Sequence, residues 1–239
     1  MKSMSLVGLV ARREITNIFR NRGLLFAGLY ISGVFGIVNM ALSGQVVAIN
    51  NTIFSAALLV GVFVGYSFSR FVFLREKREN IIETLLCTPL SVKSIWLGKV
   101  LGATVPAYLF SLLTASLVTI VSSMMLQSLL LPSAVRLIHT LWAVPVFTAA
   151  TISLMGVCQF LLGMRENTII GYLIVLMLVP FTQPSIFGLI LGDVNAVGSW
   201  FEVGICAMVA GLLLVLTAYL SRYLSKEKIV TTIPFDCCA

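Results

Sequence analysis

The sequence predicts an all-α integral membrane protein with six transmembrane helices, and three observations support this fold class. Of the 239 residues, 59% are hydrophobic and only 10% are charged, whereas soluble domains carry about a quarter charged residues. Six apolar runs are each long enough to cross the ~30 Å hydrocarbon core of a bilayer. The basic residues gather in alternate connections between these runs, as in proteins that follow the positive-inside rule.

The first 22 residues are predicted to form an amphipathic helix. Their apolar residues recur near helical spacing, and most of their arginines occupy other faces of that helix. We therefore expect residues 1–23 to lie in the membrane interface. Gly23 is expected to end this helix and to permit a sharp turn into the first span. The residues expected to anchor it against the lipid bilayer are Arg12, Arg13, Arg20 and Arg22.

The six spans follow from the apolar runs at residues 24–43, 52–73, 97–126, 140–163, 169–190 and 201–221. The third run is too long for one straight span, so its first turns are expected at the interface, with a kink at Pro106. Pro180 and Pro184 argue against a straight fifth helix. We expect this span to end near Val179, followed by a short re-entrant or interfacial helix around residues 185–191. One kinked helix is the alternative.

Basic residues predict the orientation. Fifteen of the 16 Lys and Arg residues fall in connections on one side, and Arg136 alone falls on the other. Both termini are therefore expected in the cytoplasm, in a multi-pass protein of the plasma membrane. This topology accounts for the net charge of +7 without nucleic acid as a partner. The expected single domain, 1–239, comprises an interfacial helix (1–23), spans one and two (24–73), a cytoplasmic segment (74–96), spans three to six (97–221) and a cytoplasmic tail (222–239).

The sequence lacks the patterns that enzymes and ATP-binding proteins use. His139 is the single histidine, which excludes multi-histidine metal sites, and we expect it at the outer interface. A Walker A loop is absent, because Gly98-Lys99 matches only the end of that motif and position 93 is lysine. We therefore expect no catalytic residue, metal or cofactor in this chain.

Transport coupled to ions is also not indicated, because the span centres carry no ionisable residue. Asn39 and Gln159 are the polar residues considered for lining a pathway, although such residues more often bridge helices. The stretch GVFVG, from Gly61 to Gly65, has small residues four apart and predicts close helix packing.

The most distinctive stretch is REKRENIIETLLCTPLS at residues 75–91, which holds six of the 25 charged residues. Arg75 and Glu79 are spaced to pair on a helix that continues the second span. An apolar stripe follows, and Pro89 ends the helix because it pushes Thr88 out of the α region. Ser91 can cap the next helix. The stripe consists of Ile81, Ile82, Leu85 and Leu86. It can rest on the membrane surface or in a groove of another protein.

The stretch ENIIETLLCTPLSVKSIWLGK resembles the cytoplasmic signature of ABC-2 type transporter permeases, the membrane subunits of one class of ABC exporter. The matching residues are Glu83, Leu85, Leu86, Pro89 and Lys99. Asn80 and Ile81 stand where that family usually has Gly-Thr, so the start of the helix can differ here. The resemblance extends to the six-span layout, the N-terminal helix and the broken fifth span, and so covers essentially the whole chain.

The resemblance implies a permease subunit of an ATP-driven exporter. It would form the pathway as a homodimer or with a related permease, and two cytoplasmic ABC ATPase subunits would bind ATP-Mg. Residues 76–90 would be the coupling helix seated on the ATPase, and the connection 163–168 would make a lesser contact. The expected coupling residues are Glu79, Asn80, Ile82, Glu83, Leu85, Leu86 and Pro89.

Three other functions stay open from the sequence. A permease for haem or cofactor maturation would share this size and topology. An ATP-independent channel or carrier would need an intramembrane ionisable relay or selectivity ring, which the sequence does not show. A scaffold or insertion factor is disfavoured by the lack of a large soluble domain. The transported substrate cannot be deduced from an interior that is apolar and uncharged.

Overall fold

The structure is a computed structural model that describes residues 2–42, 46–79, 91–127, 133–162, 164–182 and 200–223. These residues are almost entirely helical, and none of them lies in a strand. The longer helices are α1 (Lys2–Arg20), α2 (Arg22–Leu42), α3 (Val46–Ser69), α6 (Val92–Leu126), α8 (Val144–Leu161), α9 (Met164–Thr182) and α11 (Trp200–Leu220). The shorter elements are η1 (Arg70–Leu74), α4 (Arg75–Arg78), α7 (Ala134–Ile138), η2 (His139–Ala143) and η4 (Ser221–Tyr223).

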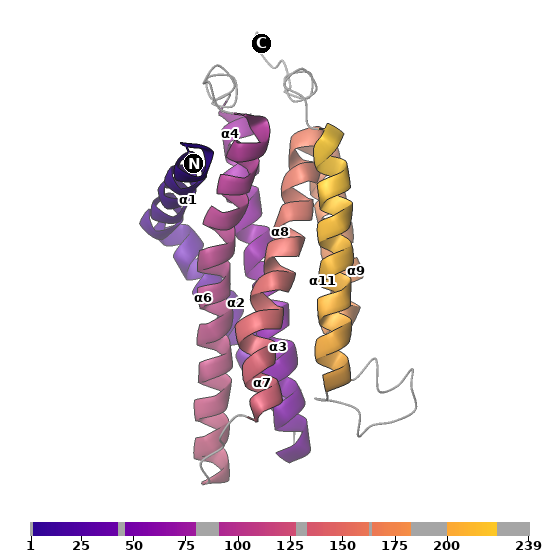
Figure 1. Cartoon of the computed structure of the whole chain (residues 1–239). Coiled ribbons are helices and arrows are strands. Elements are labelled where there is room, and N and C mark those ends of the chain that lie inside the picture. Colours follow the sequence, from indigo (N-terminus) through magenta and orange to yellow (C-terminus); the bar gives the residue numbers. More distant parts are fainter. Residues whose placement is uncertain are drawn as a thin grey trace.

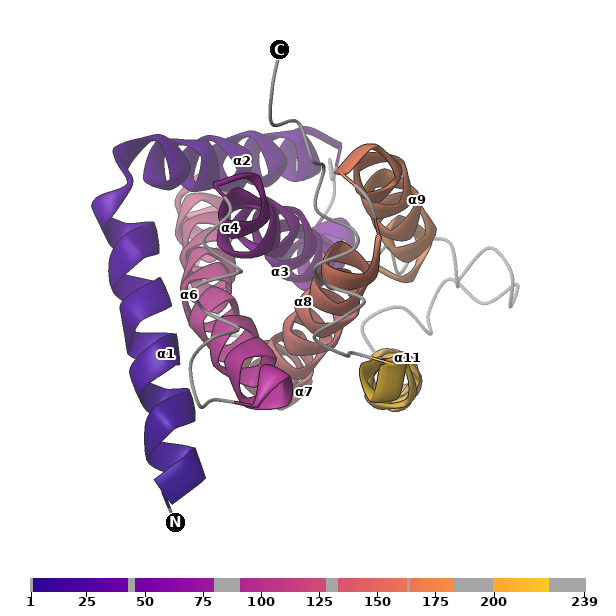
Figure 2. The same cartoon turned by 90° about the horizontal axis from the view of Figure 1, so that it is seen from above.

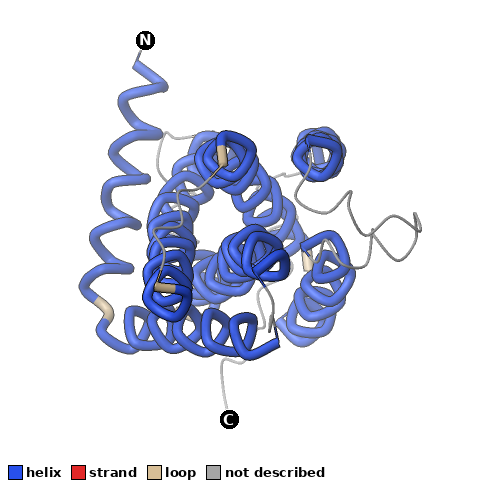
Figure 3. Tube along the Cα trace, turned by 90° about the horizontal axis from the view of Figure 1, so that it is seen from below, coloured by secondary structure: helices blue, strands red, loops and turns tan. Residues whose placement is uncertain are grey.

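Helix α3 lies at the centre of a bundle in which α6, α8 and α11 run nearly parallel to it, whereas α1 and α2 are inclined (Figure 1). It packs against α2, α6, α8 and α9, while α11 packs against α8 at the edge. Viewed along the bundle axis, α1 runs outside the bundle and along α6 (Figure 2). The same view from the opposite end shows α3 enclosed by its neighbours (Figure 3). The element that the sequence predicts as the second span is therefore the core of the fold.

The lengths and composition of the helices fit the predicted membrane protein. Four of them are long and apolar enough to cross a bilayer, at Phe54–Leu74, Val92–Met124, Ala134–Leu161 and Glu202–Tyr223. They coincide with the second, third, fourth and sixth predicted spans. Helices α1 and α2 form an apolar pair bent by 78°, and α9 contains a shorter apolar segment, Ile169–Leu178.

The bend between α1 and α2 corrects the expectation for Gly23. The break lies at Asn21, and Gly23 is already inside α2. The Asn21 side chain accepts a hydrogen bond from the Leu24 backbone N–H at 3.4 Å. This side chain caps the first turn of α2, which otherwise has unsatisfied N–H groups, so asparagine ends one helix and begins the next.

The structure bears on two predictions that were based on prolines. Pro106 lies inside α6, which continues past it as one helix of 35 residues, so this proline does not end the helix. Helix α9 extends through Pro180 to Thr182, so it ends three residues beyond Val179. The segment 185–191 lies outside the described residues, so a re-entrant helix there stays a prediction.

Close packing of α3 against α8 through Gly61 and Gly65 is confirmed. A Cβ atom added to Gly61 would overlap the Thr148 methyl group, and one added to Gly65 would lie 3.1 Å from Ile152. Ser111 reinforces this region by donating a 2.6 Å hydrogen bond to the Ala57 carbonyl. The absent side chains therefore let the two backbones approach.

Replacing Gly61 with alanine is expected to lower stability by about 1–3 kcal/mol, because overpacking forces the neighbouring helices to shift. Gly33→Ala is the matched control, since nothing lies within 4 Å of a Cβ atom added to Gly33 in α2. Both changes gain the same helix propensity. Thermal unfolding in detergent, followed by circular dichroism, compares the two, and equal melting temperatures would contradict the packing argument.

Candidate functional site

One end of the bundle gathers most of the polar contacts between helices. It contains η1, α4, the first turns of α6 and the bend between α1 and α2, and we call it the α4 end (Figure 1). Helix α3 continues through the π-helical turn η1 into α4 without a break. Such turns occur often at functional sites. The α4 end is therefore the candidate functional site.

A buried ion pair joins α1 to α6 at this end. Lys99 Nζ lies 3.5 Å from Glu14 Oε1, and the two side chains are 1% and 5% exposed. Lys99 Nζ also donates a 3.1 Å hydrogen bond to the Val72 carbonyl in η1, and it lies 5.8 Å from the centre of the Phe73 ring. A buried ammonium group needs such compensation, because removing it from water costs several kcal/mol. Lys99 thus holds α1, α6 and η1 together.

Two glycines let α1 come close enough for this pair. A Cβ atom added to Gly98 would lie 2.7 Å from Val10, and one added to Gly102 would lie 2.7 Å from Glu14. Both glycines face α1, and only a residue without a side chain fits there. Helix α1 therefore packs directly against the α6 backbone at Gly98 and Gly102, and this contact fixes its position relative to the bundle.

A second buried lysine joins α4 to the end of α8. Lys77 is 1% exposed, and its Nζ donates a 2.6 Å hydrogen bond to the Leu162 carbonyl. Leu162 is extended and follows directly after α8. A cation at this position complements the negative end of the helix dipole. Burial lowers the pKa of Lys77 from 10.5 to about 8. Lys77 connects the beginning of the 74–96 segment to the connection that follows α8.

The lowered pKa of Lys77 predicts a pH dependence of stability. Between about pH 8 and 10.5 the unfolded chain keeps the Lys77 proton that the folded chain has lost. The unfolded state then binds more protons, so the free energy of unfolding rises with pH across this window. Below pH 8 Lys77 is protonated in both the folded and the unfolded state, so the folded state carries the full free-energy cost of burying its charge.

Lys77→Met is the matched variant, because it keeps the length of the side chain and removes the titrating group. Denaturant titrations in mixed micelles from pH 7 to 10 should show the wild type gaining stability relative to the variant. A difference that stays constant over this range would contradict the pKa assignment.

Two local predictions for the 75–91 stretch are confirmed. Arg75 Nε lies 2.8 Å from Glu79 Oε1, in an exposed pair. Ser91 caps α6 by accepting a 3.2 Å hydrogen bond from the Ser94 backbone N–H. Glu79 is exposed at the end of α4 and is therefore available for contact. The remaining proposed coupling residues, Asn80, Ile82, Glu83, Leu85, Leu86 and Pro89, lie outside the described residues, and so does the stripe residue Ile81.

The structure also places the other residues singled out from the sequence. Gln159 is buried and accepts a 3.1 Å hydrogen bond from Ser69, so within this chain it bridges α8 to α3. Asn39 lies in α2, and its side chain is outside the described part of the structure. Pathway lining stays a prediction for both. The four anchoring arginines are exposed, as interfacial contact requires: Arg12, Arg13, Arg20 and Arg22.

His139 is placed differently from expectation. It lies in the π-helical turn η2 and is completely buried, with its ring stacked on Phe54 at a centroid distance of 3.4 Å. We expected an interfacial residue, because histidine near a span end can reach water. Burial of the ring against Phe54 shows that it packs as part of the core instead. No group of three metal-binding side chains occurs in the ranges that the structure describes.

Two residues with buried contacts at this end, Glu14 and Lys77, are not predicted from the sequence as site residues. Glu14 is the only acidic residue before position 76, and a lone carboxylate on an apolar helix face predicts a buried partner. For Lys77 no such signal exists, because it stands in a charged run that normally faces solvent. Comparison with known proteins adds no further assignment, since neither a protein-family model nor a curated protein matches this sequence.

Proposed function

We propose that this chain is the permease subunit of an ATP-driven ABC exporter of the ABC-2 type. In this proposal α2, α3, α6, α8, α9 and α11 are the six spans, and the α4 end faces the cytoplasm of a cell whose plasma membrane holds the protein. The chain pairs with a second permease, and two separate ABC ATPase subunits bind at the α4 end. ATP hydrolysis takes place on those partners and not on this chain.

The bond from Lys77 to Leu162 is the observation that carries this proposal. It ties the beginning of the 74–96 segment to the connection between α8 and α9, and these are the two connections that the resemblance assigns to ATPase contact. Because each is anchored to the other, a partner seated on one connection also moves the second. An interfacial helix without a role in transmission would not require this link.

The buried contacts at the α4 end offer a route for force through the membrane. Helix α4 is continuous with α3 through η1, Lys77 reaches the end of α8, and Lys99 joins η1 to α6 and α1. In this mechanism ATP-driven closure of the ATPases pushes the segment around 76–90. The central helix α3 and its neighbours then tilt together, which alternates access to the pathway.

Purification from the native membrane tests the proposal. The tagged chain, extracted in a mild detergent, should co-purify with a protein that contains a Walker A loop, in about equal amounts. The complex should hydrolyse ATP, and the chain alone should not. If the chain purifies without an ATP-binding partner and moves a solute by itself in liposomes, the proposal fails in favour of an ATP-independent channel or carrier.

A further inference from the structure

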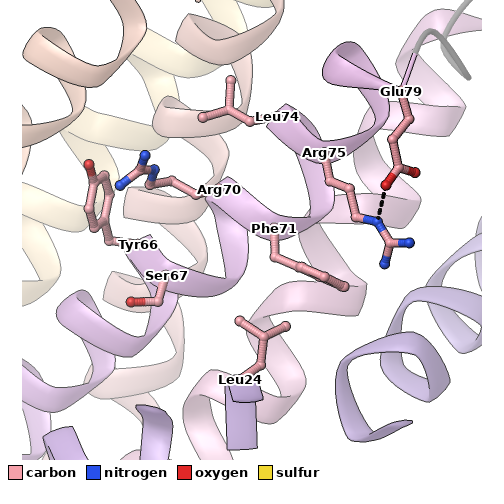
Figure 4. Close-up of a pocket in the computed structure, with 8 residues that line it drawn as sticks. All are labelled: Leu24, Tyr66, Ser67, Arg70, Phe71, Leu74, Arg75 and Glu79. Atoms are coloured by element: carbon pink, nitrogen blue, oxygen red, sulfur yellow. Dashed lines mark hydrogen bonds and ion pairs between the residues drawn. The ribbon is translucent and has the colours of Figure 1, made fainter. Parts of the chain in front are cut away.

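A cavity of about 430 Å³ opens at the α4 end, beside the π-helical turn. Figure 4 shows Arg70 extending beside Tyr66 on one side and Arg75 with Glu79 on the other. Leu24 contributes from the first turn of α2, close to the 78° bend that follows α1. Several lining residues lie at the end of the candidate span Phe54–Leu74, and in a bilayer the end of a span meets the lipid headgroups. The lining residues are Leu24, Tyr66, Ser67, Arg70, Phe71, Leu74, Arg75 and Glu79.

Among the described residues that line this cavity, the positive charge exceeds the negative charge by one. Arg75 is paired with Glu79 at 2.8 Å. Among the residues that the structure describes, no carboxylate lies within ion-pair distance of Arg70, whose guanidinium sits 5.6 Å from the centre of the Tyr66 ring. A half-buried guanidinium at the membrane interface favours an anion, and its planar donors match phosphate oxygens. The cavity therefore suits a phosphate group.

A second cavity, of about 420 Å³, lies between α3 and α9. Tyr66 lines the first cavity and Tyr172 the second, and their ring centres are 5.7 Å apart. Phe63 in the second cavity is seven residues before Arg70, which places it about 10 Å deeper along α3. This cavity is apolar, and its lining residues are Phe63, Ile169, Tyr172, Leu173, Val175 and Leu176.

The contact between α3 and α9 keeps this arrangement in place. A Cβ atom added to Gly171 would lie 2.9 Å from the Tyr66 ring, so the ring rests directly on the α9 backbone. The α9 residues beside it are exposed, with Tyr172 at 57% and Leu173 at 51%. In a protein that spans a bilayer, such a surface contacts acyl chains. One face thus presents a cation at headgroup depth above an apolar groove.

From this geometry we infer that the chain binds an anionic phospholipid along the α3–α9 face. The phosphate diester contacts Arg70, and an acyl chain lies in the groove beside Phe63 and Leu173. A free phosphate would use the first cavity and leave the apolar one empty, so the pair of cavities selects the lipid. This inference requires only that the protein lies in a membrane, and it is independent of any ATPase.

Native mass spectrometry of the delipidated full-length chain tests the inference in three arms. Phosphatidylglycerol supplies phosphate and chains, dioleoylglycerol supplies chains alone, and inorganic phosphate supplies the anion alone. We expect retention of phosphatidylglycerol only. Arg70→Gln should weaken that binding about fivefold, which corresponds to the roughly 1 kcal/mol that one arginine contributes near an anionic lipid. Arg70→Lys should keep part of it, because the charge remains.

Arg222→Gln is the matched control, because Arg222 is exposed in η4 and lies outside both cavities. Equal weakening by Arg222→Gln would overturn the inference, and so would unchanged binding in Arg70→Gln. Inorganic phosphate that displaces the lipid, or dioleoylglycerol retained as well as phosphatidylglycerol, would also overturn it. These last two outcomes are measured on the wild type and do not depend on how a variant folds.

Discussion

Replacing Glu14 with alanine is expected to destabilise the protein by about 3–5 kcal/mol, because the change leaves the buried Lys99 ammonium without its carboxylate. The two side chains are almost completely excluded from solvent, at 5% and 1% exposure. Lys99 would keep its hydrogen bond to the Val72 carbonyl, but a neutral carbonyl does not balance the buried charge. Denaturant titration in mixed micelles measures the free energy of unfolding.

Two further variants separate the ion pair from other causes. Glu14→Leu combined with Lys99→Met removes both charges and should recover much of the lost stability, since an apolar pair of similar volume is often as stable as a buried ion pair. Glu79→Ala breaks the exposed pair with Arg75 and should cost no more than ~0.5 kcal/mol. Similar losses for Glu14→Ala and Glu79→Ala would show that burial does not strengthen the Glu14–Lys99 contact.

Glu83→Lys together with Leu86→Asp is expected to abolish co-purification of the ATPase while leaving membrane insertion intact. Glu83 supplies a charge, and Leu86 belongs to the apolar stripe that the sequence predicts for the coupling helix. Placing a carboxylate in the middle of an apolar docking face removes the contact and buries an unpaired charge. The amount of the proposed ATPase partner that is recovered with the tagged chain measures the effect.

Arg222→Glu is the control for this experiment, because Arg222 is an exposed charge in η4 at the same end of the bundle. It should leave ATPase recovery unchanged. If the double variant retains the ATPase at the wild-type level, residues 83 and 86 do not form the docking face. If the control loses it as well, general charge at this end governs binding instead of the stripe.

The features that could be predicted from the sequence are those set by residues that lie close together along the chain. The Ser91 cap, the Arg75–Glu79 pair and the close approach at Gly61 are all contained in a few residues of sequence. Hydrophobic runs likewise placed the long apolar helices, because each run must bury itself in lipid regardless of its partners. The fold class therefore follows from composition and periodicity.

Contacts between distant segments could not be predicted in this way. Lys77 and Leu162 are 85 residues apart, and nothing in a charged run distinguishes the one lysine that turns inward. Glu14 and Lys99 meet only because α1 folds back on α6 at two glycines. The break at Asn21 was assigned to Gly23 because glycine is the commoner helix terminator, whereas here side-chain capping decides. The contacts that join the helices at the α4 end therefore depend on the tertiary structure and not on the local sequence.

The central claim is that the stripe in the 75–91 stretch docks on an ATPase and not on the membrane surface. Site-specific photo-cross-linking in native cells separates these two partners most directly. With Leu86 replaced by benzoylphenylalanine, illumination should yield a covalent adduct between this chain and a protein that contains a Walker A loop. Adducts with phospholipid alone would show that the stripe lies on the bilayer, and would contradict the assignment of this chain as an ABC permease.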